Sequence, residues 1–461
     1  MEGEVVLSKR SKKIILGIIL GVVTLLYSYY FRPIVDDELF NFGFAYNIMN
    51  GLVPYKDFNM IIPPLFSYIL AGILKIFGAK LIVYHIVIVL IILLIFFISY
   101  SAIGNKAFMI YLLMLIYPYT GYNMFCMGLL FILLYLEENK KNRNGKKLTQ
   151  KSKIKIKNDI IEPIIISMMF LSKQTLGLLV IPSIIFSQNK KKTISIYLLA
   201  IFGFLLYLIL TGSLVEFFDY CLFGMFDFAD KNSSAVRVLA VVEILIIIIL
   251  GYFSFTTKRK DLFFCLVFQV VALPIVDYVH FMISFIPVVY LLLKKIKNIP
   301  FVTLFGSSLI GSFFIAFNIL VFITKDNYLF LGHYDVNNFM KGRVTYNLTE
   351  GYVFRAKEYL DKYEDYRPFI LGHFSYLIKL NNNMPINKFD LINEGNMGYN
   401  GTQKYIDEID NYCKEEKCVF IINDNESDVV DIQTSGEILD YVSNNYRQVY
   451  CSSTFSVYIN R

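Results

Sequence analysis

The feature that most constrains this chain is a series of apolar runs along its first 323 residues, about 17–25 residues long and poor in charge. That is the length an α-helix needs to cross about 30 Å of hydrocarbon. A closed β-barrel would instead require alternating apolar and polar residues, and this alternation is absent. The chain is 56% hydrophobic, whereas soluble domains contain about 45–50% apolar residues. The sequence therefore predicts a polytopic α-helical membrane protein.

Short basic clusters separate the apolar runs and predict which loops face the cytoplasm, because Lys and Arg hold loops on that side. The clusters occupy residues 8–13, 140–157, 190–192, 258–260 and 294–297. The first run, 14–31, is too long for the apolar core of a signal peptide and lacks a small-residue cleavage site. We therefore expect a first transmembrane helix with its N-terminus in the cytoplasm.

We expect roughly 11–13 transmembrane helices in all. Beyond the first, the apolar segments are 61–78, 81–101, 105–118, 122–136, 160–171, 174–187, 194–211, 237–256, 262–276, 281–293 and 299–323. The pair 160–171 and 174–187 should form a hairpin of half-helices that meet at Ser172-Lys173-Gln174, since each is too short to span alone. Four spans between 61 and 136 would place the basic stretch 140–157 outside. Either 105–136 is one long helix broken at Pro118 and Gly121, or an extra short segment lies there.

Residues 325–461 differ in composition, being polar and rich in Asn, Asp, Lys and Tyr. Strands are expected at 369–371 and 419–422, and amphipathic helices at 350–363, 402–414 and 434–444. Because strands and helices alternate, the sequence predicts a small α/β domain outside the membrane. The expected division is a transmembrane domain, 1–324, which includes a first outer loop at 32–60, and a soluble extracytoplasmic domain, 325–461.

Charge and cysteine content exclude two other classes of site. The net charge is +7, but the basic residues lie in the loop clusters and form no basic groove with interleaved aromatic residues, so nucleic acid is not an expected partner. The six cysteines show no metal-binding or disulfide framework. Cys413 and Cys418 do not have zinc-site spacing, and we do not expect a disulfide between them.

The first outer loop carries the most distinctive polar residues. Asp36, Asp37 and Glu38 follow the first helix directly, and three adjacent carboxylates at a membrane surface repel one another. A site that needs a base, or a cation held by oxygen ligands, would benefit from them. The alternative is a solvated turn that caps a short interfacial helix, 39–49, because acids are favoured at helix N-termini.

The rest of this loop resembles a known family. It continues as Gly51-Leu52-Val53-Pro54-Tyr55-Lys56-Asp57, and Pro63-Pro64 opens the next segment. An Asp-Glu pair, then Gly-x-x-Pro-Tyr-x-Asp, then Pro-Pro is similar to the first outer loop of the polyprenol-phosphate-dependent glycosyltransferases of the GT-C fold. That superfamily includes the protein O-mannosyltransferases and the lipid A aminoarabinose transferase. More weakly, Lys173-Gln174-Thr175 between two short helices and His280 before Pro287 also resemble family segments.

The resemblance implies a GT-C membrane domain that transfers a sugar from a polyprenyl-phosphate carrier to an acceptor at the outer face. The acceptor would be a cell-envelope glycan, a lipid or a protein. Asp37 would be the base that deprotonates the acceptor hydroxyl, a role worth typically 10²–10⁴-fold in rate. Asp36 makes this register uncertain by one residue. Glu38 and Asp57 would position the sugar, the acceptor or a divalent cation. The resemblance specifies neither the sugar, the acceptor, the metal dependence nor the oligomeric state.

A phosphate leaving group requires fixed cations. Lys173 is the first candidate, because an unpaired ammonium between apolar half-helices is costly, although a lysine that snorkels to the interface is the simpler alternative. His280 is the second, with a locally hydrogen-bonded interfacial histidine as its alternative. Lys56 and Arg237 are weaker candidates. His85 is expected to be an ordinary helix residue near the cytoplasmic face. The outer loop at 212–236 also carries acids that could help to bind the acceptor, namely Glu216, Asp219, Asp227 and Asp230, although any exposed loop contains such residues.

Two other functions remain open. A transporter or flippase of a lipid-linked saccharide would show repeated halves and ionisable residues at mid-membrane, and neither is evident in the sequence. A non-catalytic envelope assembly component would not require Asp37.

Overall fold

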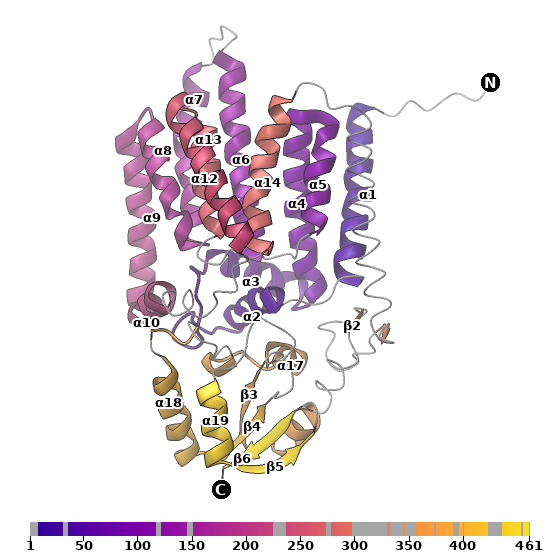
Figure 1. Ribbon diagram of the computed structural model, residues 1–461, viewed down its shortest axis with the longest axis vertical. Coiled ribbons are helices and arrows are strands. Elements are labelled where there is room, and N and C mark those ends of the chain that lie inside the picture. Colours follow the sequence, from indigo (N-terminus) through magenta and orange to yellow (C-terminus); the bar gives the residue numbers. More distant parts are fainter. Residues whose placement is uncertain are drawn as a thin grey trace, which may run out of the picture.

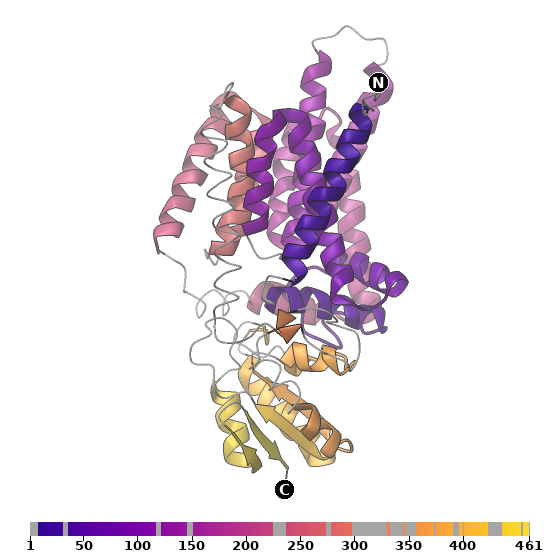
Figure 2. The ribbon, with the colours of Figure 1, turned by 90° about the vertical axis from the view of Figure 1, so that its right-hand side faces the viewer.

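The computed structural model describes residues 8–30, 36–116, 121–144, 151–224, 237–272, 278–296, 330–331, 344–345, 356–372, 375–390, 396–399, 401–422, 436–452 and 455–460. The molecule is elongated, with a bundle of long helices at one end and a small α/β domain at the other (Figure 1). The view turned by 90° shows the same division (Figure 2). The fold is thus a polytopic helical membrane protein with a C-terminal α/β domain, which confirms the expected fold class.

The bundle is built from antiparallel helices and half-helices. They are α1 (Lys9–Tyr30), α4 (Leu81–Ile103), α5 (Ala107–Ile116), α6 (Gly121–Asn144), α7 (Lys151–Phe170), η2 (Gln174–Leu179) with α8 (Val180–Phe186), α9 (Lys190–Thr211), α12 (Arg237–Thr257), α13 (Lys260–Phe268) with η4 (Gln269–Ala272), and α14 (Tyr278–Lys295). The predicted hairpin is present, with Ser172 and Lys173 at its apex, but its first arm is the 20-residue helix α7 rather than a half-helix. The predicted last span, 299–323, lies outside the described residues, so the total number of helices stays a prediction.

The outer surface of the bundle is apolar. Four described stretches are long and apolar enough to cross a membrane, namely Arg10–Tyr29, Leu81–Leu115, Lys190–Thr211 and Leu239–Thr257. On α9, Leu199 and Leu210 are 71% and 77% exposed, and on α12 Ile248 is 60% exposed. A helix that places large aliphatic side chains outward is adapted to lipid rather than to water.

The stretch Leu81–Leu115 is a helical hairpin rather than one long span. The chain reverses at η1 (Gly104–Lys106), where Gly104 has φ +59°. Phe96 on α4 then contacts Phe108 and Tyr111 on α5, with ring centroids 5.1 and 5.7 Å apart. A straight helix would separate Phe96 from Tyr111 by roughly 22 Å, so α4 and α5 run antiparallel.

The segment 61–78 was predicted to span, and this prediction is wrong. Only α3 (Leu65–Phe77) is helical there, and its 13 residues extend roughly 20 Å, less than the hydrocarbon thickness. It packs against α2 (Asp36–Met49) beneath the long helices (Figure 1). Helix α3 lies at the end of the bundle, whereas α4, α5 and α6 run along its length (Figure 1), so these three are the described helices that cross between residues 81 and 144. This removes the conflict over the basic stretch 140–157 without a broken helix or an extra segment.

Charged residues at the far end of the bundle hold the helix ends together. Lys294 on α14 pairs with Glu138 on α6 at 2.9 Å, and Lys260 on α13 pairs with Glu162 on α7. The Lys106 ammonium at the α4–α5 turn donates to the carbonyl of Leu293 (3.2 Å). The basic clusters around residues 260 and 294 thus share one end, while α2, α3 and the C-terminal domain occupy the other (Figure 1).

The C-terminal domain contains a four-stranded sheet in the order β3-β4-β6-β5. Its strands are β3 (Arg367–Leu371), β4 (Cys418–Ile422), β5 (Arg447–Cys451) and β6 (Ser456–Ile459), and only β3 and β4 pair in parallel. Its helices are 356–362, α17 (Ser375–Asn381), α18 (Gly401–Glu415) and α19 (Gly436–Asn445). A separate pair, β1 (Phe330–Leu331) and β2 (Val344–Thr345), is antiparallel.

Both predicted strands, and the helices at 402–414 and 434–444, are confirmed in this domain. Phe369 on β3 stacks on Phe420 on β4, with centroids 4.9 Å apart, and Tyr405 and Ile409 of α18 cover them. Strands β5 and β6 were not predicted. The expectation about Cys413 and Cys418 is wrong, because they form a disulfide between the end of α18 and the start of β4, with Cα atoms 5.6 Å apart. The helix end and the strand start meet in space, which spacing alone does not show.

Helix α2 joins the two parts of the molecule. The Asn47 side chain donates to the carbonyl of Ile386 (2.6 Å) and accepts from the Ile386 amide (2.9 Å). Gly43 lies under the side chains of Ile386 and Tyr376, and an added Cβ would come within 2.9 Å of the Tyr376 ring. The C-terminal domain therefore rests directly on the helix that carries the acidic motif.

Candidate active site

The acidic motif forms the first turn of α2. Asp37 is half-buried and Glu38 is 3% exposed. The amide groups of a helix N-terminus carry partial positive charge, which favours carboxylates there. The alternative interpretation is therefore right that these acids begin a short helix, but Glu38 is buried rather than solvated. The helix starts at Asp36, whose side chain lies outside the described residues.

Glu38 is sequestered by a histidine from α4. Its carboxylate contacts Nε2 of His85, and Nδ1 of His85 lies 3.0 Å from the Ser28 hydroxyl on α1. The rings of Tyr29 and Tyr84 meet the imidazole edge-on, at centroid distances of 5.4 and 5.8 Å. Because α3 lies at the end of the bundle, α4 begins at the same end as α2 (Figure 1). His85 therefore lies opposite the basic clusters around residues 260 and 294, whereas it was expected near the cytoplasmic face with such clusters.

Asn41, one turn after Asp37, connects α2 to the start of α6. Its amide donates to the Asp37 carbonyl (2.6 Å), and its Oδ1 accepts from the backbone N–H of Tyr122 (3.3 Å). Gly121 permits this approach, since a Cβ there would lie 2.7 Å from the Phe66 ring and 2.9 Å from the Tyr84 hydroxyl. The position of Asp37 thus depends on the N-terminus of α6.

Lys173 reaches the same segment from the opposite side. Its ammonium, at the apex between α7 and η2, donates to Oδ1 of Asn123 and to the carbonyl of Val271, both at 3.1 Å. It also lies 5.6 Å from the centroid of the Tyr122 ring. The side chain is 7% exposed, so it does not snorkel to the surface. Residues 121–123 of α6 therefore contact both the acidic turn of α2 and the buried ammonium.

Gln174 ties this apex to the loop that precedes α3. Its amide donates to the carbonyls of Ile61 (3.0 Å) and Cys221 (3.1 Å). In the same loop the buried hydroxyl of Tyr55 donates to the Ile62 carbonyl (2.7 Å). These contacts hold the Gly51–Asp57 and Pro63–Pro64 motifs against the half-helix hairpin.

Asp57 and Lys56 lie at the surface, unlike Glu38 and Lys173, which are buried. Both are exposed, and Oδ2 of Asp57 accepts from the Val53 amide (2.7 Å) while the Asp57 amide donates back to the Val53 carbonyl (3.0 Å). The Gly-x-x-Pro-Tyr-x-Asp motif is thus a tight turn closed by its own aspartate. Tyr55 adopts φ +70° within it. The carboxylate of Asp57 stabilises this turn.

The remaining predicted site residues are less closely connected. His280 is half-buried in the first turn of α14, one turn before Ser284. Arg237 begins α12, but its side chain lies outside the described residues. Asp219 accepts from the amide of Tyr399 in the C-terminal domain (3.0 Å). Asp227 and Asp230 lie outside the described residues.

No cluster of three or more His, Cys, Asp or Glu side chains suited to a metal ion occurs among the described residues. Sequence reasoning missed Asn41, Asn123 and the role of His85. A buried Asn gives little sequence signal, but His85 could have been noticed as an ionisable residue in an otherwise apolar run.

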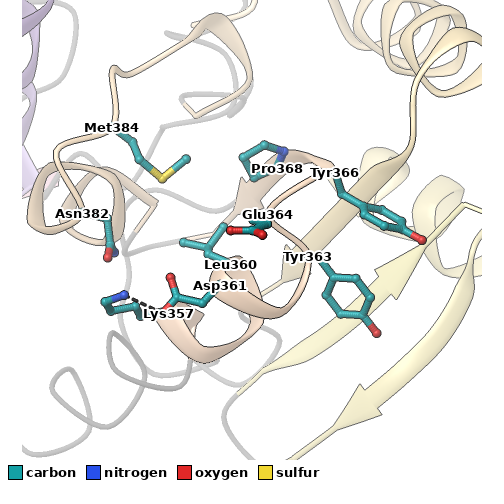
Figure 3. A pocket seen from close by; sticks show the side chains of 9 residues that line it. All are labelled: Lys357, Leu360, Asp361, Tyr363, Glu364, Tyr366, Pro368, Asn382 and Met384. Carbon is teal, nitrogen blue, oxygen red and sulfur yellow. Dashed lines mark hydrogen bonds and ion pairs between the residues drawn. The ribbon is translucent and has the colours of Figure 1, made fainter.

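A cavity lies in the C-terminal domain, apart from these residues (Figure 3). It has a volume of about 340 Å³ and is open to the surface. Asp361 and its partner Lys357 (2.6 Å) lie on one side, and Asn382 and Met384 on another. Asn383 in that same loop accepts from the Tyr46 hydroxyl on α2 (3.3 Å). The cavity therefore adjoins the C-terminal end of α2, opposite the acidic turn.

Solved structures share this architecture. ArnT from Cupriavidus metallidurans bound to undecaprenyl phosphate matches with a TM-score of 0.58 and 10% identity, over 97% of this chain and 98% of ArnT. The apo form of the same protein gives a TM-score of 0.59 and 10% identity, over 98% and 99%. The Archaeoglobus fulgidus oligosaccharyltransferase in its apo form superposes less well, with a TM-score of 0.46 and 11% identity over 90% and 70%.

The two ArnT matches cover nearly the whole of both chains, from α1 to the C-terminal sheet. The chain therefore has the GT-C fold of polytopic membrane proteins, as the first outer loop predicted. At 10% identity the likeness shows the fold. No family model and no curated protein matches the sequence.

Proposed function

We propose that this chain is an integral-membrane glycosyltransferase that moves a sugar from a polyprenyl-phosphate carrier to an acceptor hydroxyl. The observation that carries the proposal is the shared α6 segment. Asp37 is tied to it through Asn41 and Tyr122, and Lys173 is tied to it through Asn123. A carboxylate and a buried ammonium thus border one segment at the end of a GT-C bundle, and undecaprenyl phosphate is bound by a protein of the same fold.

In this reaction the Asp37 carboxylate accepts a proton, and the Lys173 ammonium stabilises a negative charge. Asp37 takes the proton from the acceptor hydroxyl, whose oxygen forms a bond to the anomeric carbon of the sugar. The bond between that carbon and the phosphate oxygen breaks, and its electron pair stays on the phosphate. Lys173 stabilises the negative charge that develops there. A single displacement of this kind inverts the anomeric carbon. The products are the glycosylated acceptor and the free polyprenyl phosphate.

The other residues support this arrangement. Glu38 acts through His85 to hold the α2 turn, and Asp57 holds the loop turn. His280 is a candidate for a further donor contact, with Lys56 and Arg237 as weaker ones. If a divalent cation takes part, Asp37 is the carboxylate at hand for it. We place the α2 end and residues 325–461 outside the cytoplasm, because the basic clusters occupy the opposite end.

The test is sugar transfer by membranes that contain the wild type or Asp37→Asn, each given radiolabelled polyprenyl-phosphate sugars. We expect transfer by the wild type and none by Asp37→Asn, with equal expression and membrane insertion of both. Asp36→Asn is the matched control and should retain transfer. Loss in Asp36→Asn alone would move the base by one residue. Equal turnover by wild type and both variants would overturn the assignment of the base, and no turnover by wild type would favour transport or scaffolding.

A further inference from the structure

A carboxyl group inside the bundle accepts no well-aligned hydrogen bond from the described residues. Glu243 on α12 is 1% exposed, and neither of its carboxylate oxygens accepts a hydrogen bond from the described residues. The Ser284 hydroxyl on α14 lies beside it, but its proton is donated to the carbonyl of Phe281 (2.7 Å). Within the described part of the chain, the Ser284 hydroxyl is thus the one donor near these oxygens, and it is shared with the Phe281 carbonyl.

A second unpartnered acceptor lies in the same place. Gln269, at the start of η4, is fully buried, and its amide donates to the carbonyl of Ser284 (2.7 Å). Its Oε1 has no partner among the described residues. Ser284 thus contacts Glu243 through its side chain and Gln269 through its carbonyl. The three buried acceptor oxygens therefore belong to two residues that both adjoin Ser284.

Burying the acceptor oxygens of Glu243 and Gln269 costs free energy unless hydrogen-bond donors from outside the chain pair with them. Buried polar atoms are nearly always hydrogen-bonded, and an ionisable side chain within a membrane bundle marks a functional site by default. A leucine would fill the same volume without the penalty. Acceptor oxygens without donors call for a ligand that carries donors, such as the hydroxyl groups of a sugar.

The position of Gln269 indicates which ligand. It lies two residues before Val271, whose carbonyl accepts from the Lys173 ammonium. In a 3₁₀ turn the rise is about 2 Å per residue, so the two positions lie about 4 Å apart along the axis. In a sugar bonded directly to a phosphate, the hydroxyl groups lie at a comparable distance from the phosphate. Val271 of η4 therefore borders the proposed phosphate site, and Gln269, at the start of η4, provides one of the unpartnered acceptors.

We propose that Glu243 and Gln269 bind hydroxyl groups of the donor's sugar while Lys173 holds its phosphate. The proposal rests on the proposed function and adds the part of the site that recognises the sugar. Because all three free atoms are acceptors, the site takes a neutral or amino sugar and rejects one whose carboxylate would face Glu243.

The experiment compares binding of bare undecaprenyl phosphate with binding of its neutral monoglycosylated forms, by purified wild type, Glu243→Gln and Glu243→Leu. The wild type should bind a glycosylated carrier more tightly than the bare one. Both variants should bind the glycosylated carrier about tenfold more weakly and the bare carrier unchanged. Ser254→Ala is the control, since it removes another buried, unpartnered polar atom of α12, three turns away. It should change neither affinity.

Thermal unfolding separates this role from a structural one. If Glu243 serves a ligand, Glu243→Leu removes an unsatisfied buried group, so its Tm without ligand should rise. The inference would be overturned if the Tm of Glu243→Leu fell. It would also be overturned if the variants kept their affinity for the glycosylated carrier, or lost affinity equally for both carriers. If the wild type binds neither carrier, the proposed function fails with it. If the wild type and both variants bind the two carriers alike, the inference fails alone.

Discussion

The carboxylate of Glu38 and the imidazole of His85 form a buried pair that joins the first turn of α2 to the first turn of α4. The two residues lie 47 positions apart in the sequence. This pair holds the residue next to the proposed base, so it determines how the α2 turn faces the bundle.

Replacing His85 should reduce catalysis more than donor binding. His85→Ala removes the imidazole that contacts the buried Glu38 carboxylate, at a cost of about 1–3 kcal/mol, and loosens the turn that carries Asp37. We expect kcat to fall at least tenfold while the KM for the donor stays nearly constant, with partial rescue by His85→Asn. Ser99→Ala, which alters a buried polar residue on the same helix, is the control. An unchanged kcat alongside a lowered Tm would show that the pair is only structural.

Asp57 should behave as a turn residue rather than as a ligand. Asp57→Ala removes the acceptor for the Val53 amide and should destabilise the loop by about 1 kcal/mol, with a proportionate fall in transfer. Asp57→Asn keeps an acceptor oxygen and should be nearly neutral. Transfer rates and Tm of both variants check this. If Asn is as harmful as Ala while Tm stays constant, Asp57 contacts substrate or metal.

The docking of the C-terminal domain should depend on Gly43. A Cβ there meets Ile386 and the Tyr376 ring, so Gly43→Ala should separate α2 from α17 and expose that surface. We expect faster limited proteolysis of the C-terminal domain and a lower Tm, with rescue by the second change Ile386→Ala. Gly72→Ala is the matched control, because no atom lies within 4 Å of its added Cβ. Equal proteolysis of the two single variants would contradict the packing described.

The buried pair Lys379–Asp390, 2.6 Å apart, should make stability depend on pH once it is broken. Burial raises the pKa of the Asp390 carboxyl, and Lys379 holds part of that rise back. Lys379→Met should therefore cost about 3–5 kcal/mol at neutral pH, where Asp390 is left charged and unpaired.

The sign of this pH dependence follows from the raised pKa. As the pH falls through the folded-state pKa of Asp390, this carboxyl takes up a proton more readily in the folded than in the unfolded chain. The stability lost in Lys379→Met should therefore decrease. Thermal unfolding at pH 5 and pH 8 measures it. The double variant Lys379→Met/Asp390→Asn should recover most of the loss at both pH values. A deficit of Lys379→Met that is the same at both would contradict the assignment.

Part of the site could be predicted from short-range patterns. The order Asp37-Glu38, Gly51 to Asp57 and Pro63-Pro64 indicated the fold, and the apex at Lys173 followed from two short apolar runs around one charge. The disulfide, the pairing of β5 with β6 and the place of His85 depend on residues far apart in the chain. Local propensity contains no information about such contacts.

The sequence by itself determined that this chain is a helical membrane bundle followed by an α/β domain, because the length of an apolar run and the alternation of strand and helix are local properties. Only the tertiary structure decided that α3 stays at one end of the bundle, which sets the direction of every later helix. It also decided that Glu38 pairs with His85, that Lys173 shares residues 121–123 with the α2 turn, and that Glu243 is buried with no well-aligned donor among the described residues. Each of these depends on which distant side chains the packing brings within hydrogen-bonding distance, and burial then makes the presence or absence of a partner energetically important.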